Sequence, residues 1–161
     1  MWGKFIKKAR IFRPAVISEA KKTRAQELRE EVSNLVRFKR SEFECKCGCG
    51  QAGVDYELIF MPEIMRAELE ALFNAAVVVE VTSGNRCPKH NSETPGAFVN
   101  SYHPKGMAGD FKFRFRNTGK YIDSKLLYDL ACRLFPNKYG IGQYSNRIHL
   151  DCRKGKGRWK K

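Results

Sequence analysis

The sequence predicts an α+β domain, because within residues 41–153 two stretches have the apolar spacing of helices and four have the pattern of strands. Apolar residues recur every three or four positions over residues 62–76 and 122–135. Strand patterns occur at residues 77–81, 111–116, 139–144 and 147–153. With 161 residues, the chain has the length of one domain with a real core.

Both predicted helices are amphipathic. The first is expected to have Pro62 in its first turn, where proline is favoured. Its broad apolar face, which we expect to be buried, consists of Ile64, Met65, Ala67, Leu69, Leu72 and Phe73. The second helix ends before Pro136, and its apolar residues are Leu126, Leu127, Leu130, Ala131 and Leu134.

The predicted strands differ in pattern. Residues 77–81 are β-branched and apolar except for Glu80, which is typical of a short buried strand. Residues 111–116 alternate Phe with Lys or Arg, so one face is aromatic and the other basic. We expect the aromatic face to be core. In residues 147–153, His149 and Asp151 are two positions apart and therefore lie on one face.

The charge is concentrated at the two ends of the chain. Residues 1–40 carry twelve Lys and Arg against four Glu, and residues 153–161 carry six basic residues and no acid, which accounts for the full net charge of +14. We therefore divide the chain into a basic arm with an amphipathic helix from Ser18 (1–40), a central domain (41–153) and a flexible basic tail (154–161). Basic ends predict a polyanionic partner, such as nucleic acid or teichoic acid; solubility tails are the alternative.

The sequence contains no apolar run of the length of a transmembrane helix and no apolar core of a signal peptide at its start. We therefore expect no secretion by the general pathway.

One motif has metal-ligand character. His103 and Asp110 cannot both face one point from a continuous helix, but a Gly-containing loop that runs into a strand can bring them to one ion, with His149 as the third ligand. Two nitrogens and one oxygen suit zinc, and three protein ligands leave a position open for a water molecule that the metal acidifies. Such a site would be catalytic.

A second group of soft ligands lies in Cys45-Lys-Cys47-Gly-Cys49, with Cys87 and His90 further on. Gly48 and Gly50 permit the bend that would turn alternate thiols toward one point. Two interpretations are open: a closed structural zinc site of Cys45, Cys47, Cys49 and Cys87, or reduced or disulfide-bonded thiols with Cys132 and Cys152 as further partners.

Four motifs follow one another between about residues 43 and 153: Thr82–Asn91 with Arg86-Cys-Pro, Ser101-x-His103-x-x-Gly-x-Ala-x-Asp110, Gly140-Ile-Gly-x-Tyr144, and Ile148-His149-x-Asp151-x-Arg153. Together they resemble the zinc D-Ala-D-Ala carboxypeptidase family. That family includes phage endolysins and bacterial murein peptidases, and it shares its fold with the hedgehog signalling domain. The resemblance implies a small antiparallel sheet flanked by helices, and a Zn²⁺ ion held by His103, Asp110 and His149.

The resemblance also suggests roles for other residues. Arg86 occupies a substrate-binding position, and its planar guanidinium matches a carboxylate; pairing with an acid of the protein is the alternative. Ser101 and Tyr144 are candidates to hydrogen-bond the substrate or the developing oxyanion. Many relatives have a catalytic carboxylate three residues before the last histidine ligand, where this chain has Asn146. Asp151 is the candidate substitute base, or else it orients a metal-binding histidine.

Three functions follow from these observations. The leading hypothesis is a phage or bacterial zinc metallopeptidase that hydrolyses peptidoglycan, either as a carboxypeptidase or as an endolysin endopeptidase. Without a secretion signal, such an enzyme is expected to reach the cell wall from the host cytoplasm after lysis-pore formation, or packaged in a virion. The second is an inactive zinc-binding module, which the missing acid at position 146 favours. The third is a virion structural protein that binds nucleic acid through its basic ends.

Overall fold

The computed structural model describes residues 37–161, which form one compact unit. The basic arm and the helix predicted from Ser18 lie outside the described residues, apart from the arm's last positions. The elements, in order, are η1 (Arg40–Phe43), α2 (Tyr56–Phe73), β1 (Val77–Ser83), α3 (Pro88–Glu93), η2 (His103–Lys105), β2 (Ala108–Phe115), α4 (Ser124–Leu134), β3 (Gly140–Gln143), β4 (Ile148–Asp151) and β5 (Gly157–Lys160). The predicted α+β class is confirmed.

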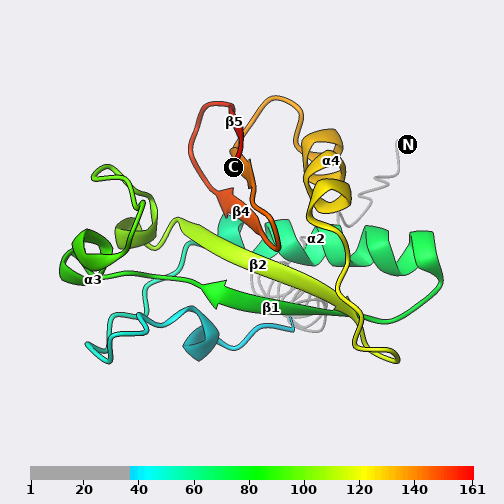
Figure 1. Cartoon of the computed structure of the whole chain (residues 1–161), viewed down its shortest axis with the longest axis horizontal. Coiled ribbons are helices and arrows are strands. Elements are labelled where there is room, and N and C mark those ends of the chain that lie inside the picture. Colours follow the sequence, from blue (N-terminus) through cyan, green and yellow to red (C-terminus); the bar gives the residue numbers. More distant parts are fainter. Residues whose placement is uncertain (1–36) are drawn as a thin grey trace, which may run out of the picture. The chain divides into compact units, whose positions relative to one another are not determined.

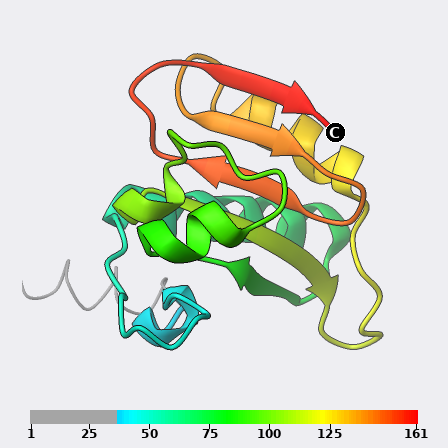
Figure 2. The ribbon, with the colours of Figure 1, turned by 60° about the vertical axis from the view of Figure 1, so that its left-hand side comes forward.

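The five strands form one sheet in the order β1-β2-β4-β3-β5. Neighbours are antiparallel except for β3 and β5, which run parallel. Helices α2 and α4 cover one face of the sheet, as Figure 2 shows, while α3 and the segment that leads to β2 lie at the other side, near one end of β1 and β2 (Figures 1 and 2). The core therefore fills the layer between the sheet and the two long helices.

The first long helix, α2, differs from its prediction in two ways. It begins at Tyr56, where the side chain of Asp55 accepts a hydrogen bond from the Glu57 N–H, so Pro62 lies inside the helix and not in its first turn. Ile64, Leu72 and Phe73 are at least 40% exposed, whereas Met65 and Leu69 are buried as predicted.

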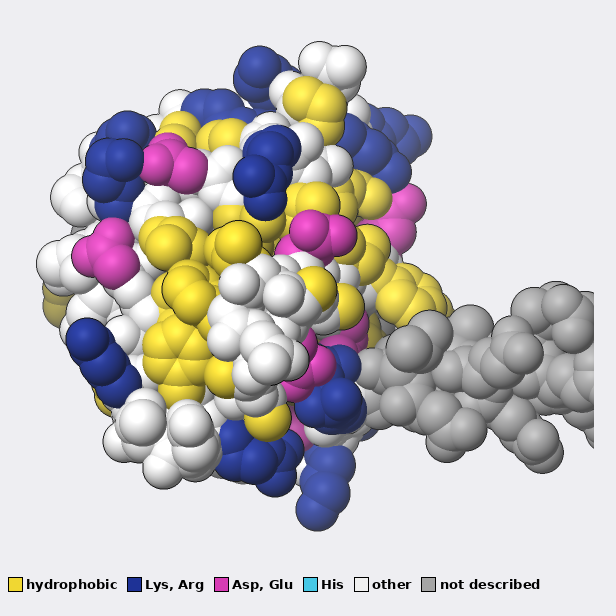
Figure 3. All heavy atoms as spheres, turned by 90° about the vertical axis from the view of Figure 1, so that its right-hand side faces the viewer, with side chains coloured by type: hydrophobic (Ala, Val, Ile, Leu, Met, Phe, Trp, Pro, Cys, Tyr) yellow, Lys and Arg dark blue, Asp and Glu magenta, His cyan; other side chains and the backbone are white. Residues whose placement is uncertain are grey.

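The buried side of α2 also contains an ion pair that apolar periodicity does not reveal. Glu63 and Arg66 are both buried and hydrogen-bond to each other, and Glu63 accepts a further bond from the Arg37 N–H. Because their charges are satisfied in this way, Glu63 and Arg66 can be buried, whereas Ile64 and Ala67, which were predicted to be buried, are exposed. Hydrophobic side chains remain visible at the surface on the side of the molecule where α2 ends (Figure 3).

The strand predictions hold, with changes at the ends. In β2, Phe111 and Phe113 are completely buried while Lys112 is partly exposed, so the alternation was interpreted correctly. Strand β1 extends to Ser83, but Val77 alone among its residues is fully buried, because β1 is an edge strand that pairs with β2 only. Helix α4 and strands β3 and β4 lie within the predicted ranges.

The prediction of a flexible tail after Arg153 was wrong. Residues Gly157–Lys160 form β5, which extends the sheet by pairing with β3. Trp159 lies opposite Gly142, where a Cβ atom would come within 2.3 Å of the indole ring, so the absent side chain makes room for the tryptophan. Among the helices of residues 37–161, none combines the length and apolar character needed to cross a membrane.

Candidate active site

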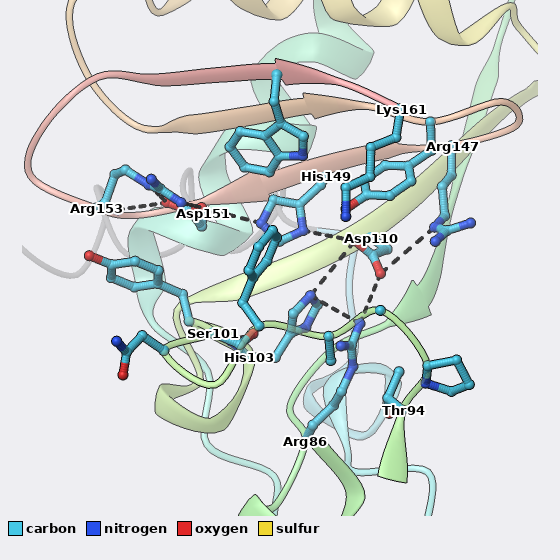
Figure 4. A pocket seen from close by; sticks show the side chains of 18 of the residues that line it. Arg86, Thr94, Ser101, His103, Asp110, Arg147, His149, Asp151, Arg153 and Lys161 are labelled. Carbon is cyan, nitrogen blue, oxygen red and sulfur yellow. Dashed lines mark hydrogen bonds and ion pairs between the residues drawn. The ribbon is translucent and has the colours of Figure 1, made fainter. Parts of the chain in front are cut away.

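Three elements bring the predicted metal ligands together. Asp110 in β2 and His149 in β4 face each other directly in the antiparallel register, and His103 lies in η2, just before β2. One ligand atom from each residue lies within 4.8 Å of the others, and all three residues are buried. Figure 4 shows the carboxylate of Asp110 between the two imidazoles.

Hydrogen bonds orient both imidazole rings. His103 Nδ1 lies 2.6 Å from the carbonyl oxygen of Gly84. Since a carbonyl can only accept, Nδ1 carries the proton and the unprotonated Nε2 faces Asp110, whose Oδ1 is 3.7 Å away. Burial lowers the pKa of His103, against the opposing effect of Asp110, so the ring is held neutral as a metal ligand requires.

His149 is placed between two carboxylates. Its Nδ1 lies 2.9 Å from Asp110 Oδ1 and its Nε2 lies 3.2 Å from Asp151 Oδ2. Burial alone would lower the pKa of His149, but the hydrogen bonds with Asp110 and Asp151 outweigh it and raise that pKa. The nitrogen that faces His103 and Asp110 is thus Nδ1, and the opposite nitrogen is engaged by Asp151.

Asp110 is ionised, and Arg86 holds its second oxygen, Oδ2. Burial would raise its pKa, but its contacts with His103 and His149 outweigh burial and hold the pKa well below its usual range. Arg86 Nη2 lies 3.1 Å from Asp110 Oδ2, while Arg86 Nε donates to Ser83 Oγ at 2.9 Å. Arg86 therefore pairs with an acid of the protein, the alternative weighed from the sequence, and it leaves Oδ1 directed at the histidines.

The donor set fits a zinc ion. Two imidazole nitrogens and one carboxylate oxygen are ligands that zinc prefers, and their mutual distances allow one ion to contact all three. The three residues form the floor of a pocket, so the fourth side of such an ion would face open space.

Asp151 is fully occupied by the protein itself. Its Oδ1 accepts hydrogen bonds from the Gly140 N–H, the Arg153 N–H and Arg153 Nε, and its Oδ2 accepts from Arg153 Nη2 and lies beside His149. Burial would raise the pKa of Asp151, but these contacts outweigh burial and hold that pKa well below its usual range. The carboxylate is completely inaccessible, and a Cβ at Gly140 would come within 2.1 Å of it.

The pocket above the site is cationic and aromatic, with a volume of about 760 Å³. Ser101 and Tyr144, both predicted to face a substrate, line it. Ser101 Oγ accepts a hydrogen bond from the His103 N–H, so it also holds the ligand loop. The Arg147 guanidinium lies over the Tyr144 ring at 4.4 Å. Further lining side chains are Tyr102, Arg153, Trp159, Lys160 and Lys161.

A comparison with protein families finds a match to Peptidase M15 over residues 36–151. The chain belongs to the peptidase M15 family. This confirms the resemblance to zinc D-Ala-D-Ala carboxypeptidases that the motifs indicated, and it supports peptidase activity. Comparison with curated proteins and with solved structures finds no match.

Within this peptidase fold, Asn146 does not reach the pocket. It is exposed in the turn between β3 and β4 and is absent from the pocket lining. Among the described residues, Asp110 and Asp151 are the only Asp or Glu side chains that line the pocket, and both are engaged by the contacts given above. Within residues 37–161, therefore, no other element supplies a free side-chain carboxylate in place of the acid that many relatives have at the position of Asn146.

Sequence reasoning missed Trp159 and Arg147 as pocket residues. The ring centroid of Trp159 lies 5.1 Å from that of His149, and Arg147 Nε lies 3.8 Å from Asp110 Oδ2. An aromatic residue in an otherwise basic, glycine-containing tail was the available signal for Trp159. Nothing in the sequence around Arg147 distinguishes it from the other surface cations.

The cysteine group is also assembled. Cys45, Cys47, Cys49 and Cys87 lie close together, away from the pocket lining, and all six cysteines are free thiols. Cys132 and Cys152, considered as disulfide partners, are not part of this group.

Proposed function

We propose that the chain is a zinc metallopeptidase that hydrolyses peptide bonds of bacterial peptidoglycan, in a phage or a bacterium. The observation that carries the proposal is the convergence of His103, Asp110 and His149 at the floor of a cationic pocket, in a chain of the peptidase M15 family. A zinc ion bound there would supply a Lewis acid that polarises the scissile carbonyl and activates a water molecule.

The protein groups around the ligands have defined tasks in this proposal. The Gly84 carbonyl fixes the tautomer of His103, and Arg86 fixes the orientation of Asp110. Asp151 holds His149 by its Nε2, so that Nδ1 faces the site. We assign Asp151 to orienting His149, because five contacts already occupy its two oxygens and burial keeps it from a substrate.

The pocket lining supports an acidic peptide as substrate. Peptidoglycan stem peptides carry carboxylates, and the pocket presents Arg147, Arg153 and two C-terminal lysines within one cavity. Aromatic faces at Tyr102 and Tyr144 offer packing surfaces for the peptide's short apolar side chains. Tyr144 and Ser101 are the candidate hydrogen-bond donors to the oxyanion that forms at the cleaved carbonyl.

A second candidate function is a zinc-binding module without peptidase activity. The occupied Asp151 and the exposed Asn146 favour it, since general-base catalysis typically contributes a factor of about 10² to 10⁴. Such a protein would keep the metal and the pocket and would bind peptidoglycan fragments without cutting them.

The test is incubation of the purified protein with intact peptidoglycan, followed by mass analysis of the new termini. We expect cleavage that stops on chelation, returns with added zinc, and is lost in His103→Ala. Lys125→Ala, an exposed change in α4, is the control and should cleave normally. Zinc bound through His103 without any cleavage would establish the second candidate, and no zinc bound at His103 would exclude both.

A further inference from the structure

Two separate segments of the chain supply the cysteine group. The loop that follows η1 supplies Cys45, Cys47 and Cys49, and the start of α3 supplies Cys87. Cys45 Sγ is 3.3 Å from Cys47 Sγ, which in turn is 3.6 Å from Cys87 Sγ, and all four sulfurs lie within 4.8 Å of one another. These distances are far longer than a disulfide bond of about 2.05 Å.

The spacing matches a tetrahedral thiolate site. With zinc–sulfur bonds of about 2.3 Å, the sulfurs of a Cys₄ site are about 3.8 Å apart, so the four sulfurs need only small shifts to surround one ion. Gly48 and Gly50 both have positive φ, at 78° and 77°, and curl the loop so that alternate cysteines face inward. The loop conformation thus serves the convergence of the thiols.

We propose that Cys45, Cys47, Cys49 and Cys87 bind a second zinc ion in a closed, non-catalytic site that holds the active-site segment Gly84–Cys87 in place. Backbone N–H groups already support two of the sulfurs: Cys87 N donates to Cys45 Sγ at 3.2 Å, and His90 N donates to Cys87 Sγ at 3.3 Å. His90 Nδ1 lies 3.2 Å from Cys45 Sγ, which makes it a hydrogen-bond partner of a ligand sulfur and not a fifth ligand.

The connection to the active site is short. Cys87 directly follows Arg86, and Gly84 provides the carbonyl that orients His103. The end of η1, which leads into the cysteine loop, packs tightly on this segment: Asn85 N donates to the Phe43 carbonyl at 2.7 Å, and a Cβ at Gly84 would come within 2.5 Å of the Phe43 Cα. Gln51 adds a bond to the Asn85 side chain and another to the Pro104 carbonyl, next to His103. An ion that cross-links Cys87 to this loop therefore fixes the position of Arg86.

The test separates the two metal sites by composition. Native mass spectrometry of the reduced full-length protein should find two zinc ions per chain, one in Asp110→Asn, and one in Cys47→Ser. Cys132→Ser, which changes a cysteine outside the group, is the matched control and should keep two. If Asp110→Asn keeps one zinc and the double variant Asp110→Asn/Cys47→Ser keeps none, the zinc kept by Asp110→Asn is bound by the cysteines. This conclusion holds whether or not the protein is a peptidase.

Thiol alkylation of the unmodified protein gives a second measurement that needs no variant. Cys47 and Cys49 are exposed, so an alkylating reagent can reach both thiols when no ion binds them. We expect both to be protected until a chelator is added, as located by peptide mass mapping. Equal reaction rates with and without chelator, a disulfide bond between two of the four cysteines, or iron in place of zinc would overturn the proposal.

Discussion

The two ligand clusters of this protein are built in opposite ways. Asp110 and His149 are cross-strand partners in the sheet, and neighbouring protein groups hold them and His103 in place. The cysteine group lies on loops, with two of its members exposed and few protein contacts to hold them. The sheet-borne cluster is thus pre-formed and faces a pocket, whereas the loop-borne cluster depends on its ion for rigidity.

The largest expected effect is therefore on stability, and it belongs to the cysteine cluster. Zinc in small closed sites contributes several kcal/mol to folding, so chelation should lower the melting temperature by roughly 10 °C or more. Chelation should cause the same fall in Asp110→Asn, in which only the cysteine-bound ion remains. It should cause a much smaller fall in Cys47→Ser. Thermal unfolding followed by circular dichroism measures this. If chelation lowers the melting temperature of Cys47→Ser more than that of Asp110→Asn, the larger contribution to stability comes from the sheet-borne cluster and not from the cysteines.

The second largest expected effect is on zinc binding and catalysis by the sheet-borne cluster. Asp151→Asn keeps the shape of the side chain but weakens its hold on His149, so we expect zinc affinity and kcat/KM to fall by about 10- to 100-fold. The acid limb of the pH profile should keep its shape, because Asp151 orients a ligand and takes no proton from the attacking water molecule.

Asp129→Asn makes the same chemical change at an exposed position of α4 and serves as the control. A loss of about 10⁴-fold in Asp151→Asn together with disappearance of the acid limb would instead identify Asp151 as the general base.

Much of this arrangement could be predicted from the sequence, and the reasons for the exceptions are physical. Helical and strand periodicity predicted α4 and the second half of β2, because their burial is one-sided. The start of α2 was misplaced because Pro62 was taken as a first-turn residue, whereas the cap is Asp55. The ligand residues were found through motif spacing and family resemblance.

Other features depend on contacts between distant segments, which no local pattern encodes. Strand β5 is four residues long and exists through its pairing with β3. The pairing of Arg86 with Asp110 and the complete engagement of Asp151 also require the folded sheet. For this reason the sequence left open whether Asp151 is a base or an orienting residue.

A smaller effect tests whether the C-terminal strand belongs to the active-site region. In Gly142→Ala the new methyl group would collide with the Trp159 indole, at 2.3 Å, and we expect a loss of about 1–3 kcal/mol with weaker peptidoglycan cleavage. Gly155→Ala, where the added carbon meets nothing within 4 Å, is the matched control. Urea unfolding curves measure the difference. Equal stability of the two variants would show that β5 does not depend on the Gly142–Trp159 contact.

The smallest effect is expected outside both clusters, at Glu80 on the edge strand. Its hydrogen bond from Arg114 lowers its pKa, against burial and with help from Tyr121. A depressed carboxyl pKa stabilises the fold above the unfolded-state value of about 4.3 and loses that contribution as the pH falls through the folded-state value. Glu80→Gln should therefore cost less than about 1 kcal/mol at pH 7, and nothing in strong acid. A difference that grows toward acid pH would contradict this assignment.

The contrast between the two clusters is tested most directly by anomalous X-ray scattering at the zinc edge from crystals of the full-length protein. We predict two peaks. One should be about 2.0–2.2 Å from His103 Nε2, Asp110 Oδ1 and His149 Nδ1, with its fourth side toward the pocket, and the other about 2.3 Å from four cysteine sulfurs. Absence of the first peak from zinc-saturated crystals would contradict the peptidase site, and absence of the second would contradict the structural one.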